Sequence, residues 1–216
     1  MAVKEELLRR ISDAIVDLND DGVVGLCQDY LEESYDALDG IMLGLIAGMN
    51  RVSQLFDEGE FFVTDVLIAG EAMKKGIAVL RPYVKKDPST GAAVKVVMGT
   101  VEGDTHDLGK NIVKILLEAA GFETYDLGND VELEKFADAA IRENAQVIMM
   151  TALMTTILGG MRIVIQDCID KGIRDKVKII VGGAAVSPEF AHEIGADGYA
   201  VNATDTVALV KRLTAK

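Results

Sequence analysis

Residues 93–120 read AVKVVMGTVEGDTHDLGKNIVKILLEAA, and the fold prediction starts from this stretch. It begins with the apolar, partly β-branched run Ala93–Met98, which is typical of a buried strand. It ends with Ile112–Ala120, whose apolar residues recur three or four apart, as they do on one face of a helix. The polar loop Gly99–Gly109 joins the two. A strand, a polar loop and a helix in this order form one βα unit, which indicates a parallel sheet.

The same alternation recurs four more times toward the C-terminus. The predicted strands are Phe122–Tyr125, Val147–Met150, Val177–Val181 and Gly198–Val201, and the predicted helices are Val131–Arg142, Ile157–Lys171, Pro188–Ile194 and Thr206–Leu213. The acidic run Asp130–Glu134 is expected to be a solvated helix start. Five βα units predict an α/β fold, an open five-stranded parallel sheet of the flavodoxin or Rossmann kind with helices on both faces. In the flavodoxin-like strand order 2-1-3-4-5, a ligand is expected at the carboxyl ends of strands 1 and 3, where the order reverses.

The N-terminal part has helical periodicity throughout. From residue 3 to about residue 85, apolar residues recur three or four apart. Breaks are expected at Asn19–Gly22, at Asp39-Gly40 and at Gly59. A fourth helix is expected to begin near Thr64-Asp65, because both residue types favour helix N-caps. Four helices joined by short turns predict a small antiparallel bundle.

A polar segment that contains Pro88 and Gly91 separates the two patterns. Because its composition is that of a linker, we place the domain boundary there. The predicted domains are a helical-bundle cap over residues 1–86 and a Rossmann-like domain over residues 92–216, joined by a linker over residues 87–91. The linker is either a hinge or an inert tether, and the sequence leaves both interpretations open.

The composition excludes several functions. The chain has 216 residues, with 22 Lys and Arg against 35 Asp and Glu, and its net charge of −13 argues against binding to nucleic acid or to an anionic membrane. No apolar run reaches the roughly 18 residues of a membrane span, and charges stand where a signal peptide is apolar, so we expect a cytoplasmic protein. Two histidines cannot build a three-histidine zinc site, and Cys27 and Cys168 are expected to be buried thiols.

One of the two histidines lies in the loop after the first predicted strand, at the expected ligand-binding edge. Asp104 precedes His106 by two residues, close enough for its carboxylate to accept a hydrogen bond from the imidazole, as a carboxylate does behind a metal-bound histidine. Gly103 and Gly109 allow the loop to turn tightly and a bulky ligand to approach the backbone. An N-capping aspartate followed by an exposed histidine explains the same residues equally well.

Two further loops end at the same predicted edge. Thr151, Thr155 and Thr156 follow the third strand, and their hydroxyls either bind a ligand or cap the following helix. Gly182-Gly183 follows the fourth strand and either leaves room for a cofactor or forms a plain turn. Together with the loop after the first strand, these residues can line one crevice.

The spacing of these residues resembles the cobalamin-binding signature of methionine synthase and of corrinoid methyl-carrier proteins. Asp104-x-His106-x-x-Gly109, Thr151-x-Leu153 and Gly182-Gly183 stand where that signature has Asp-x-His-x-x-Gly, Ser-x-Leu and Gly-Gly. The helical half resembles the cap domain of the same family over Leu55–Phe62 and Ala72-Met73, so the resemblance covers nearly the whole chain. Its closest form is the separate corrinoid protein of the methylamine, methanol, betaine and aryl-ether methyltransferase systems, and residues 151–156 look most like the methylamine branch.

The resemblance implies that cobalamin binds with its own benzimidazole base replaced on the cobalt by His106, whose electron donation Asp104 adjusts. One histidine then suffices as the metal ligand, because the corrin ring brings four nitrogen ligands. The nucleotide tail of cobalamin is expected along the loops after strands 3 and 4, and the cap is expected to cover the reactive face of the cobalt. The implied cofactor contacts are Gly103, Asp104, Thr105, His106, Asp107, Gly109, Thr151, Leu153, Thr155, Gly182 and Gly183, with Phe56, Val63 and Val66 from the cap.

By resemblance, the protein is a methyl carrier that is not catalytic alone. It is expected to accept a methyl group on cobalt from a methylated substrate, of the methylamine type, that a substrate-specific methyltransferase holds. It then passes the group to a second methyltransferase, with coenzyme M or tetrahydrofolate as acceptor. A reductive activase is implied as a third partner. No residue of this chain stands out as a site for the methyl donor.

Other classes of protein share parts of this pattern. The cobalamin subunit of a radical mutase has the Asp-x-His-x-x-Gly motif, but mutases pair that domain with a barrel instead of a helical bundle. A cobalamin-dependent sensor also has a helical bundle before this domain, but such sensors add a DNA-binding or signalling module. A cofactor-free receiver domain has a phosphorylatable Asp after strand 3, where this chain has Thr151.

Overall fold

The structure is a computed structural model that describes residues 2–85 and 94–215. Tertiary contacts divide the chain into two units, Met1–Lys85 and Lys86–Lys216, which we call the helical unit and the sheet unit. The predicted linker, residues 87–91, lies outside the described residues. None of the described helices is long and apolar enough to cross a membrane.

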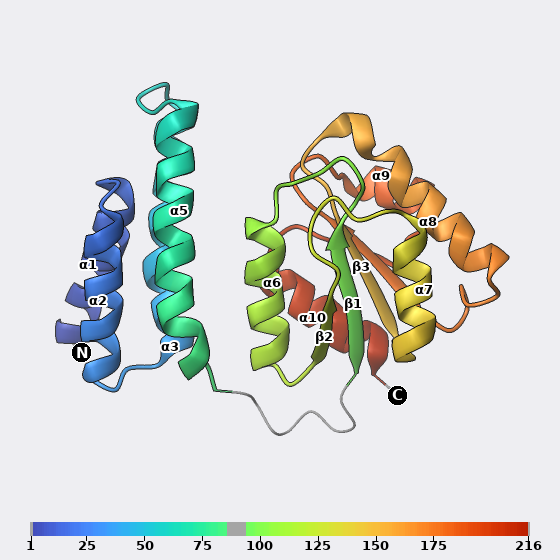
Figure 1. Ribbon diagram of the computed structural model, residues 1–216, viewed down its shortest axis with the longest axis horizontal. Coiled ribbons are helices and arrows are strands. Elements are labelled where there is room, and N and C mark those ends of the chain that lie inside the picture. The colour runs from blue at the N-terminus through green and yellow to red at the C-terminus, as the bar shows by residue number, and fades with distance from the viewer. Residues whose placement is uncertain (1, 86–93, 216) are drawn as a thin grey trace. The chain divides into compact units, whose positions relative to one another are not determined.

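The helical unit is the predicted four-helix bundle (Figure 1). Its elements are α1 (Ala2–Val16), α2 (Asp20–Glu32), α3 (Ala37–Asp39), the π-helical turn η1 (Gly40–Leu45), α4 (Ile46–Asp57), α5 (Val63–Leu80) and the 3₁₀ turn η2 (Arg81–Tyr83). Because α3, η1 and α4 follow one another without a break, they form one helix. This helix and α2 pack against α1 and α5, with Ile11, Ile15 and Leu45 fully buried between them.

The predicted break at Asp39-Gly40 is wrong, because both residues lie inside this continuous helix. The chain turns earlier, after α2, and the side chain of Asp36 caps the next helix by accepting backbone hydrogen bonds. A Cβ atom on Gly44 would lie 2.9 Å from Ile11, and one on Gly48 would lie 2.8 Å from the backbone of α1. Glycines at these positions therefore allow two helices to approach closely. In a sequence, a glycine needed for close packing looks the same as a glycine that ends a helix.

The start of α5 also differs from the prediction. The helix begins at Val63, and Phe62 is its N-cap residue. Asp65 stabilises this start from the third helical position, where its Oδ2 atom accepts a hydrogen bond from the Phe62 N–H at 2.8 Å.

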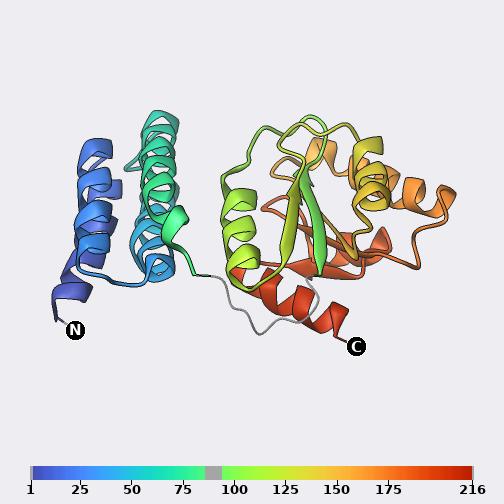
Figure 2. The ribbon, with the colours of Figure 1, turned by 60° about the horizontal axis from the view of Figure 1, so that its bottom comes forward.

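The sheet unit is a parallel sheet in the predicted order β2-β1-β3-β4-β5, and every strand and helix predicted for this half is present (Figures 1 and 2). The strands are β1 (Lys95–Thr100), β2 (Glu123–Asp126), β3 (Val147–Thr151), β4 (Lys178–Gly182) and β5 (Gly198–Ala200). The helices are α6 (Leu108–Ala119), α7 (Glu134–Glu143), α8 (Gly159–Asp170), α9 (Pro188–Glu193) and α10 (Ala203–Thr214), with a 3₁₀ turn η3 (Thr155–Ile157) before α8.

Alternate residues of the interior strand β1 face two separate cores. Val96 and Met98 pack with residues of α6 and α10, whereas Val97 packs with residues of α7 and α8. This alternation along β1 is what a strand covered on both faces requires.

Cys27 and Cys168 are buried free thiols, as predicted.

The register of the sheet brings three strands to an end together. Thr100 of β1 pairs with Thr151 of β3, and Thr151 pairs with Gly182 of β4. The loops that follow these strands therefore begin side by side, at what we call the carboxyl edge of the sheet.

Candidate functional site

Backbone hydrogen bonds join the loops at the carboxyl edge. Val101 N donates to Thr151 O at 3.1 Å, which links the loop after β1 to β3. Ala152 N donates to Gly182 O at 3.1 Å, which links the loop after β3 to β4. The predicted site residues that follow β1, β3 and β4 thus belong to one continuous surface.

His106 has an exposed ring, with 55% of its side chain accessible to solvent. Its Nδ1 atom lies 2.8 Å from Oδ1 of Asp104, and its backbone N–H donates to the same oxygen at 2.9 Å. An ionised carboxylate only accepts hydrogen bonds, so Nδ1 carries a proton, and in the neutral imidazole the lone pair is then on Nε2. An exposed imidazole with a free Nε2 lone pair can bind a metal ion.

Asp104 is the buried support of this histidine. Its side chain is fully buried, and its Oδ2 atom accepts a hydrogen bond from Leu153 N at 2.7 Å. Burial alone would raise the pKa of Asp104, but hydrogen bonds from the His106 and Leu153 N–H groups and from the His106 ring hold this pKa below its usual range. The carboxylate therefore stays charged and connects the loop after β1 to the loop after β3.

The hydroxyl group of Thr151, at the end of β3, is buried and has no hydrogen-bond partner among the described residues. A buried polar group without a partner costs about 1–3 kcal/mol, so this hydroxyl can gain from a ligand that supplies one. Thr155 and Thr156 are exposed, and no side chain caps α8. The capping alternative for these threonines therefore does not describe the structure.

The glycine pair after β4 is packed against neighbouring backbone. Gly183 has a φ of +107°, and a Cβ atom there would lie 2.2 Å from Ala152 O. A Cβ atom on Gly182 would lie 3.0 Å from Ala200 O. We expected the missing side chains to leave room beside the sheet, but backbone atoms fill that space. The pair instead allows the loops after β3 and β4 to approach each other.

The other predicted cofactor residues of the sheet unit lie in the same loops. Gly103 turns the loop after β1 with a φ of +90°. Apart from the chain neighbours and the backbone of α6 itself, no heavy atom of residues 2–85 or 94–215 lies within 4 Å of a Cβ placed on Gly109, so the space next to it is open. Thr105 and Leu153 are exposed, and Asp107 is half-buried at the N-cap of α6. Their contact with a cofactor stays a prediction.

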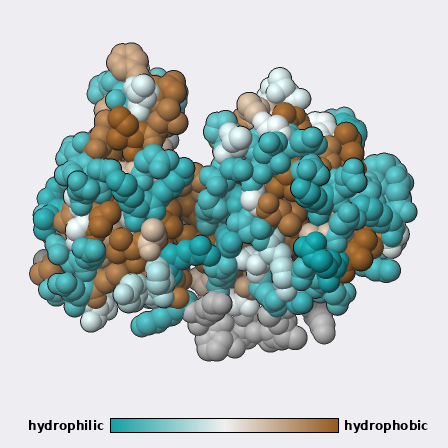
Figure 3. All heavy atoms as spheres, viewed as in Figure 1, coloured by the Kyte–Doolittle hydropathy of each residue, from teal (hydrophilic) through white to brown (hydrophobic). Residues whose placement is uncertain are grey.

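The predicted cap residues lie on consecutive elements of the helical unit. Phe56 is near the end of α4 and 43% exposed, and Val63 is the first residue of α5 and 62% exposed. Val66 is half-buried one turn further along α5. Hydrophobic residues gather on the surface at this end of the unit (Figure 3). The predicted role of these three residues stays a prediction.

A buried charge cluster next to the site was not predicted from the sequence. Lys110, in the first turn of α6, has a side chain that is 1% exposed, and its Nζ atom lies 2.7 Å from Oδ1 of Asp126 at the end of β2. Lys114 Nζ lies 3.1 Å from the other carboxylate oxygen, and Gly128 N donates to Oδ1 at 3.0 Å. The cluster ties the helix that follows the His106 loop to the loop after β2. No periodicity or motif pairs these residues, because they come from different elements.

Asp126→Asn is expected to lower the free energy of unfolding of the sheet unit by about 2 kcal/mol at pH 7, because it leaves the buried Lys110 ammonium without a counter-charge. Burial raises the pKa of Asp126, but Lys110, the Gly128 N–H and Lys114 hold it below its usual range. The folded pKa is below the unfolded value of about 4, so this stabilisation is complete above that pH and is lost as the pH falls through the folded pKa. Urea unfolding of both proteins across this pH range measures it. A difference that does not shrink in acid would contradict the assignment.

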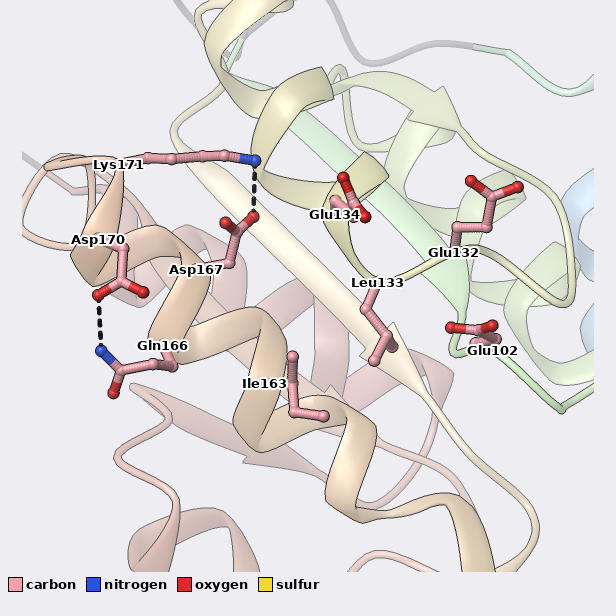
Figure 4. A pocket seen from close by; sticks show the side chains of 9 residues that line it. All are labelled: Glu102, Glu132, Leu133, Glu134, Ile163, Gln166, Asp167, Asp170 and Lys171. Carbon is pink, nitrogen blue, oxygen red and sulfur yellow. Dashed lines mark hydrogen bonds and ion pairs between the residues drawn. The ribbon is translucent and has the colours of Figure 1, made fainter.

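A separate hollow of about 580 Å³ lies beside α7 and α8 (Figure 4). It is lined by Glu102, Glu132, Leu133, Glu134, Ile163, Gln166, Asp167, Asp170 and Lys171. Lys171 points to Asp167, and Gln166 points to Asp170. None of the predicted site residues lines this hollow, and its polar side chains partly satisfy one another. It is distinct from the carboxyl-edge site.

Comparison with known proteins relates both units to one cofactor. Residues 94–210 and residues 7–81 each match a family described as B12 binding domain. Dimethylamine corrinoid protein 2 of Methanosarcina acetivorans is 42% identical over 99% of this chain and 98% of its own length. The structure of the Methanosarcina barkeri monomethylamine corrinoid protein is 33% identical, with a TM-score of 0.84, over 97% of this chain and 99% of that one. The methanol:cobalamin methyltransferase complex MtaBC from Methanosarcina barkeri is 34% identical, with a TM-score of 0.53, over 96% of this chain and 79% of that one.

Proposed function

Because this chain belongs to the corrinoid proteins with B12-binding domains, we propose that it carries a methyl group on the cobalt of a bound cobalamin, with His106 as the protein ligand of the cobalt. The observation that carries the proposal is the exposed His106 ring, whose Nδ1 atom is bound to the buried Asp104 carboxylate. When bound, cobalamin supplies a cobalt atom that accepts a methyl group from one molecule and releases it to another. The chain itself supplies the binding site and the axial nitrogen.

The residues of the carboxyl edge fit a corrinoid. A corrin ring brings four nitrogen ligands, so one further nitrogen from the protein would suffice, and Nε2 of His106 would supply it. The buried Thr151 hydroxyl has no hydrogen-bond partner within the described part of the chain, and a polar group of the nucleotide tail can supply one. The open space next to Gly109 leaves room for a large ligand close to the backbone.

Asp104 has two tasks in this proposal. By accepting a hydrogen bond from the Nδ1–H group, with Nδ1 2.8 Å from Oδ1, it favours the tautomer in which Nε2 can bind the metal. By staying charged, it increases the electron density that the ring gives to the metal. Both tasks require the buried position, because water would compete for the same hydrogen bonds.

The methyl donor is proposed to be a methylated amine. Relatives over nearly the full chain are named as dimethylamine and monomethylamine corrinoid proteins, which supports this donor class. The structural similarity to a complex with a methyltransferase supports a methyltransferase as the partner that holds the donor. A second methyltransferase with coenzyme M or tetrahydrofolate, and a reductive activase, complete the proposed cycle.

His106→Ala is expected to abolish coordination of the bound cobalt by a histidine nitrogen, because it removes the one proposed protein ligand. The measurement is the electron paramagnetic resonance spectrum of the full chain, labelled with nitrogen-15 histidine and reconstituted with cob(II)alamin. A bound histidine nitrogen then splits the cobalt lines into doublets, whereas the unlabelled nitrogen of the cofactor's benzimidazole base splits them into triplets. The wild-type protein should show the doublets, and His106→Ala should lose them.

His192→Ala is the matched control, because His192 is the other histidine of the chain and lies exposed on α9. It should keep the wild-type spectrum. Doublets that persist in His106→Ala, or that disappear in His192→Ala, would refute the assignment of the ligand.

A further inference from the structure

The loop between β2 and α7 runs beside the loop that carries His106. Thr100 N donates to Gly128 O at 3.2 Å, and Val131 N donates to Thr100 O at 3.1 Å. Val101 and Val131 form a parallel bridge beyond the ends of the named strands. This loop therefore extends the pairing of the sheet up to the carboxyl-edge site.

Asp130 makes the contacts that join the two loops. Its Oδ1 atom accepts a hydrogen bond from Gly103 N at 2.7 Å. Its own N–H donates to Asp104 O at 2.8 Å and to Thr100 Oγ1 at 3.1 Å. The expected solvated helix start over Asp130–Glu134 is thus wrong for Asp130, since α7 begins at Glu134. Asp130 therefore contacts Gly103 and Asp104, the two residues directly before Thr105 and His106.

The contact with Gly103 holds a peptide group that has two alternative orientations. Asp104 N donates to Val101 O at 3.0 Å, which closes a four-residue turn, and Gly103 stands third in it with a φ of +90°. In such turns, the central peptide group can turn over, which exchanges one turn type for another. The Asp130 carboxylate binds the N–H of this central peptide group. It therefore selects one turn type and fixes the orientation of the peptide group directly before Gly103, next to Asp104.

Asp130 itself has an unfavourable backbone conformation. Its φ of +48° lies in the left-handed region, which few residues other than glycine adopt. Asp and Asn tolerate this region better than most residues, and the three hydrogen bonds of Asp130 offset its cost. The conformation is what allows one residue to present both its N–H and its carboxylate to the neighbouring loop.

We propose that Asp130 is a positioning residue for the cobalt ligand: through Gly103 and Asp104, it holds His106 in the orientation that binds the metal. The proposal rests on the proposed function, because it concerns the strength with which His106 binds cobalt. Asp130 lies outside the Asp-x-His-x-x-Gly motif and need not contact the cofactor.

The test compares three substitutions in the full chain reconstituted with cyanocobalamin. Asp130→Gly removes the carboxylate and tolerates the left-handed backbone. Asp130→Asn keeps a neutral oxygen acceptor, which forms a weaker hydrogen bond than a carboxylate. Asn144→Gly is the matched control, because Asn144 has a φ of +52° at the end of α7, away from the two loops. Added cyanide displaces a protein ligand and gives the dicyano form, whose visible spectrum differs.

The cyanide concentration at half conversion should fall about tenfold for Asp130→Gly and about threefold for Asp130→Asn, and should not change for Asn144→Gly. In the cofactor-free protein, the backbone N–H of His106, which donates to Asp104, should exchange with solvent about tenfold faster in Asp130→Gly. If Asp130→Gly does not fold, the threefold shift of Asp130→Asn remains the test. Equal midpoints for the wild type and the Asp130 variants would overturn the proposal.

His106→Ala separates this proposal from the one on which it rests. If His106→Ala has the wild-type midpoint, His106 is not the ligand and the proposed function fails. If His106→Ala shifts the midpoint strongly and Asp130→Gly does not, only the positioning role of Asp130 fails.

Discussion

Asp104→Ala is expected to lower the free energy of unfolding of the sheet unit by about 3 kcal/mol in the absence of cofactor. The substitution removes the acceptor of three hydrogen bonds, from the backbone N–H groups of His106 and Leu153 and from the His106 ring. The Leu153 N–H loses a charged partner in a position that water reaches poorly, since the Asp104 side chain is fully buried. The loops after β1 and β3 lose the side chain that connects them.

Amide hydrogen exchange of the β3 residues measures this effect, because their slowest exchange reports the opening of the whole sheet. Asp107→Ala is the control: Asp107 is three residues further along and makes no side-chain capping bond, so the change should stay within about 0.5 kcal/mol. The loss of unfolding free energy for Asp104→Asn should lie between those for Asp104→Ala and Asp107→Ala. The amide nitrogen of the new asparagine must face an N–H donor in either orientation of the side chain. An equal loss for Asp104→Ala and Asp107→Ala would show that the buried carboxylate does not hold the loops.

Gly183→Ala is expected to destabilise the sheet unit by about 4 kcal/mol and to prevent cofactor binding. The alanine Cβ atom would lie 2.2 Å from Ala152 O, and the φ of +107° is unfavourable for any residue with a side chain. The nearest atoms are all backbone, so no rotation of a side chain can relieve the contact. The loops after β3 and β4 must separate, which displaces the Thr151–Leu153 segment.

Gly172→Ala separates the effect of φ from that of the contact. Gly172 has a φ of +66°, but among the described residues other than its chain neighbours no heavy atom lies within 4 Å of a Cβ placed there. Its substitution should cost about 1 kcal/mol, the penalty for the left-handed conformation alone. Urea unfolding of both variants without cofactor measures the loss of stability. Titration of both variants with cobalamin measures the loss of cofactor binding. Similar losses for the two variants would mean that the loops can move apart at little cost.

Much of the sheet unit could be predicted because each element has a local signal. The strands β1, β3 and β4 are short, mostly apolar runs, the helices have apolar stripes, and right-handed crossovers leave few strand orders. The helix boundaries of the helical unit were harder to predict. Gly44 and Gly48 lie inside a helix because tertiary packing against α1 requires small residues there. The same glycine type that ends a helix elsewhere is buried against α1 in this unit. Local sequence does not distinguish these cases.

The candidate site was predictable in its centre and not in its surroundings. The spacing of Asp104 and His106 predicted a hydrogen bond that the structure contains at 2.8 Å. The contacts of Asp126 and Asp130 could not be predicted from the sequence. The partner of Asp126 lies in α6, and the partner of Asp130 lies in the loop after β1. What decides their roles is the pairing of β1 with β2, which no single motif records.

The site forms only after four strands have paired in the sheet. Its residues follow β1, β2, β3 and β4, and Gly183 comes long after His106 in the order of synthesis. A nascent chain that ends before β4 already contains the histidine and its aspartate, but not the packed loops around them. Parallel strands also pair over long stretches of chain, which slows folding. The cofactor therefore binds after the sheet has formed. A chain with bound cofactor is one whose sheet unit has folded completely.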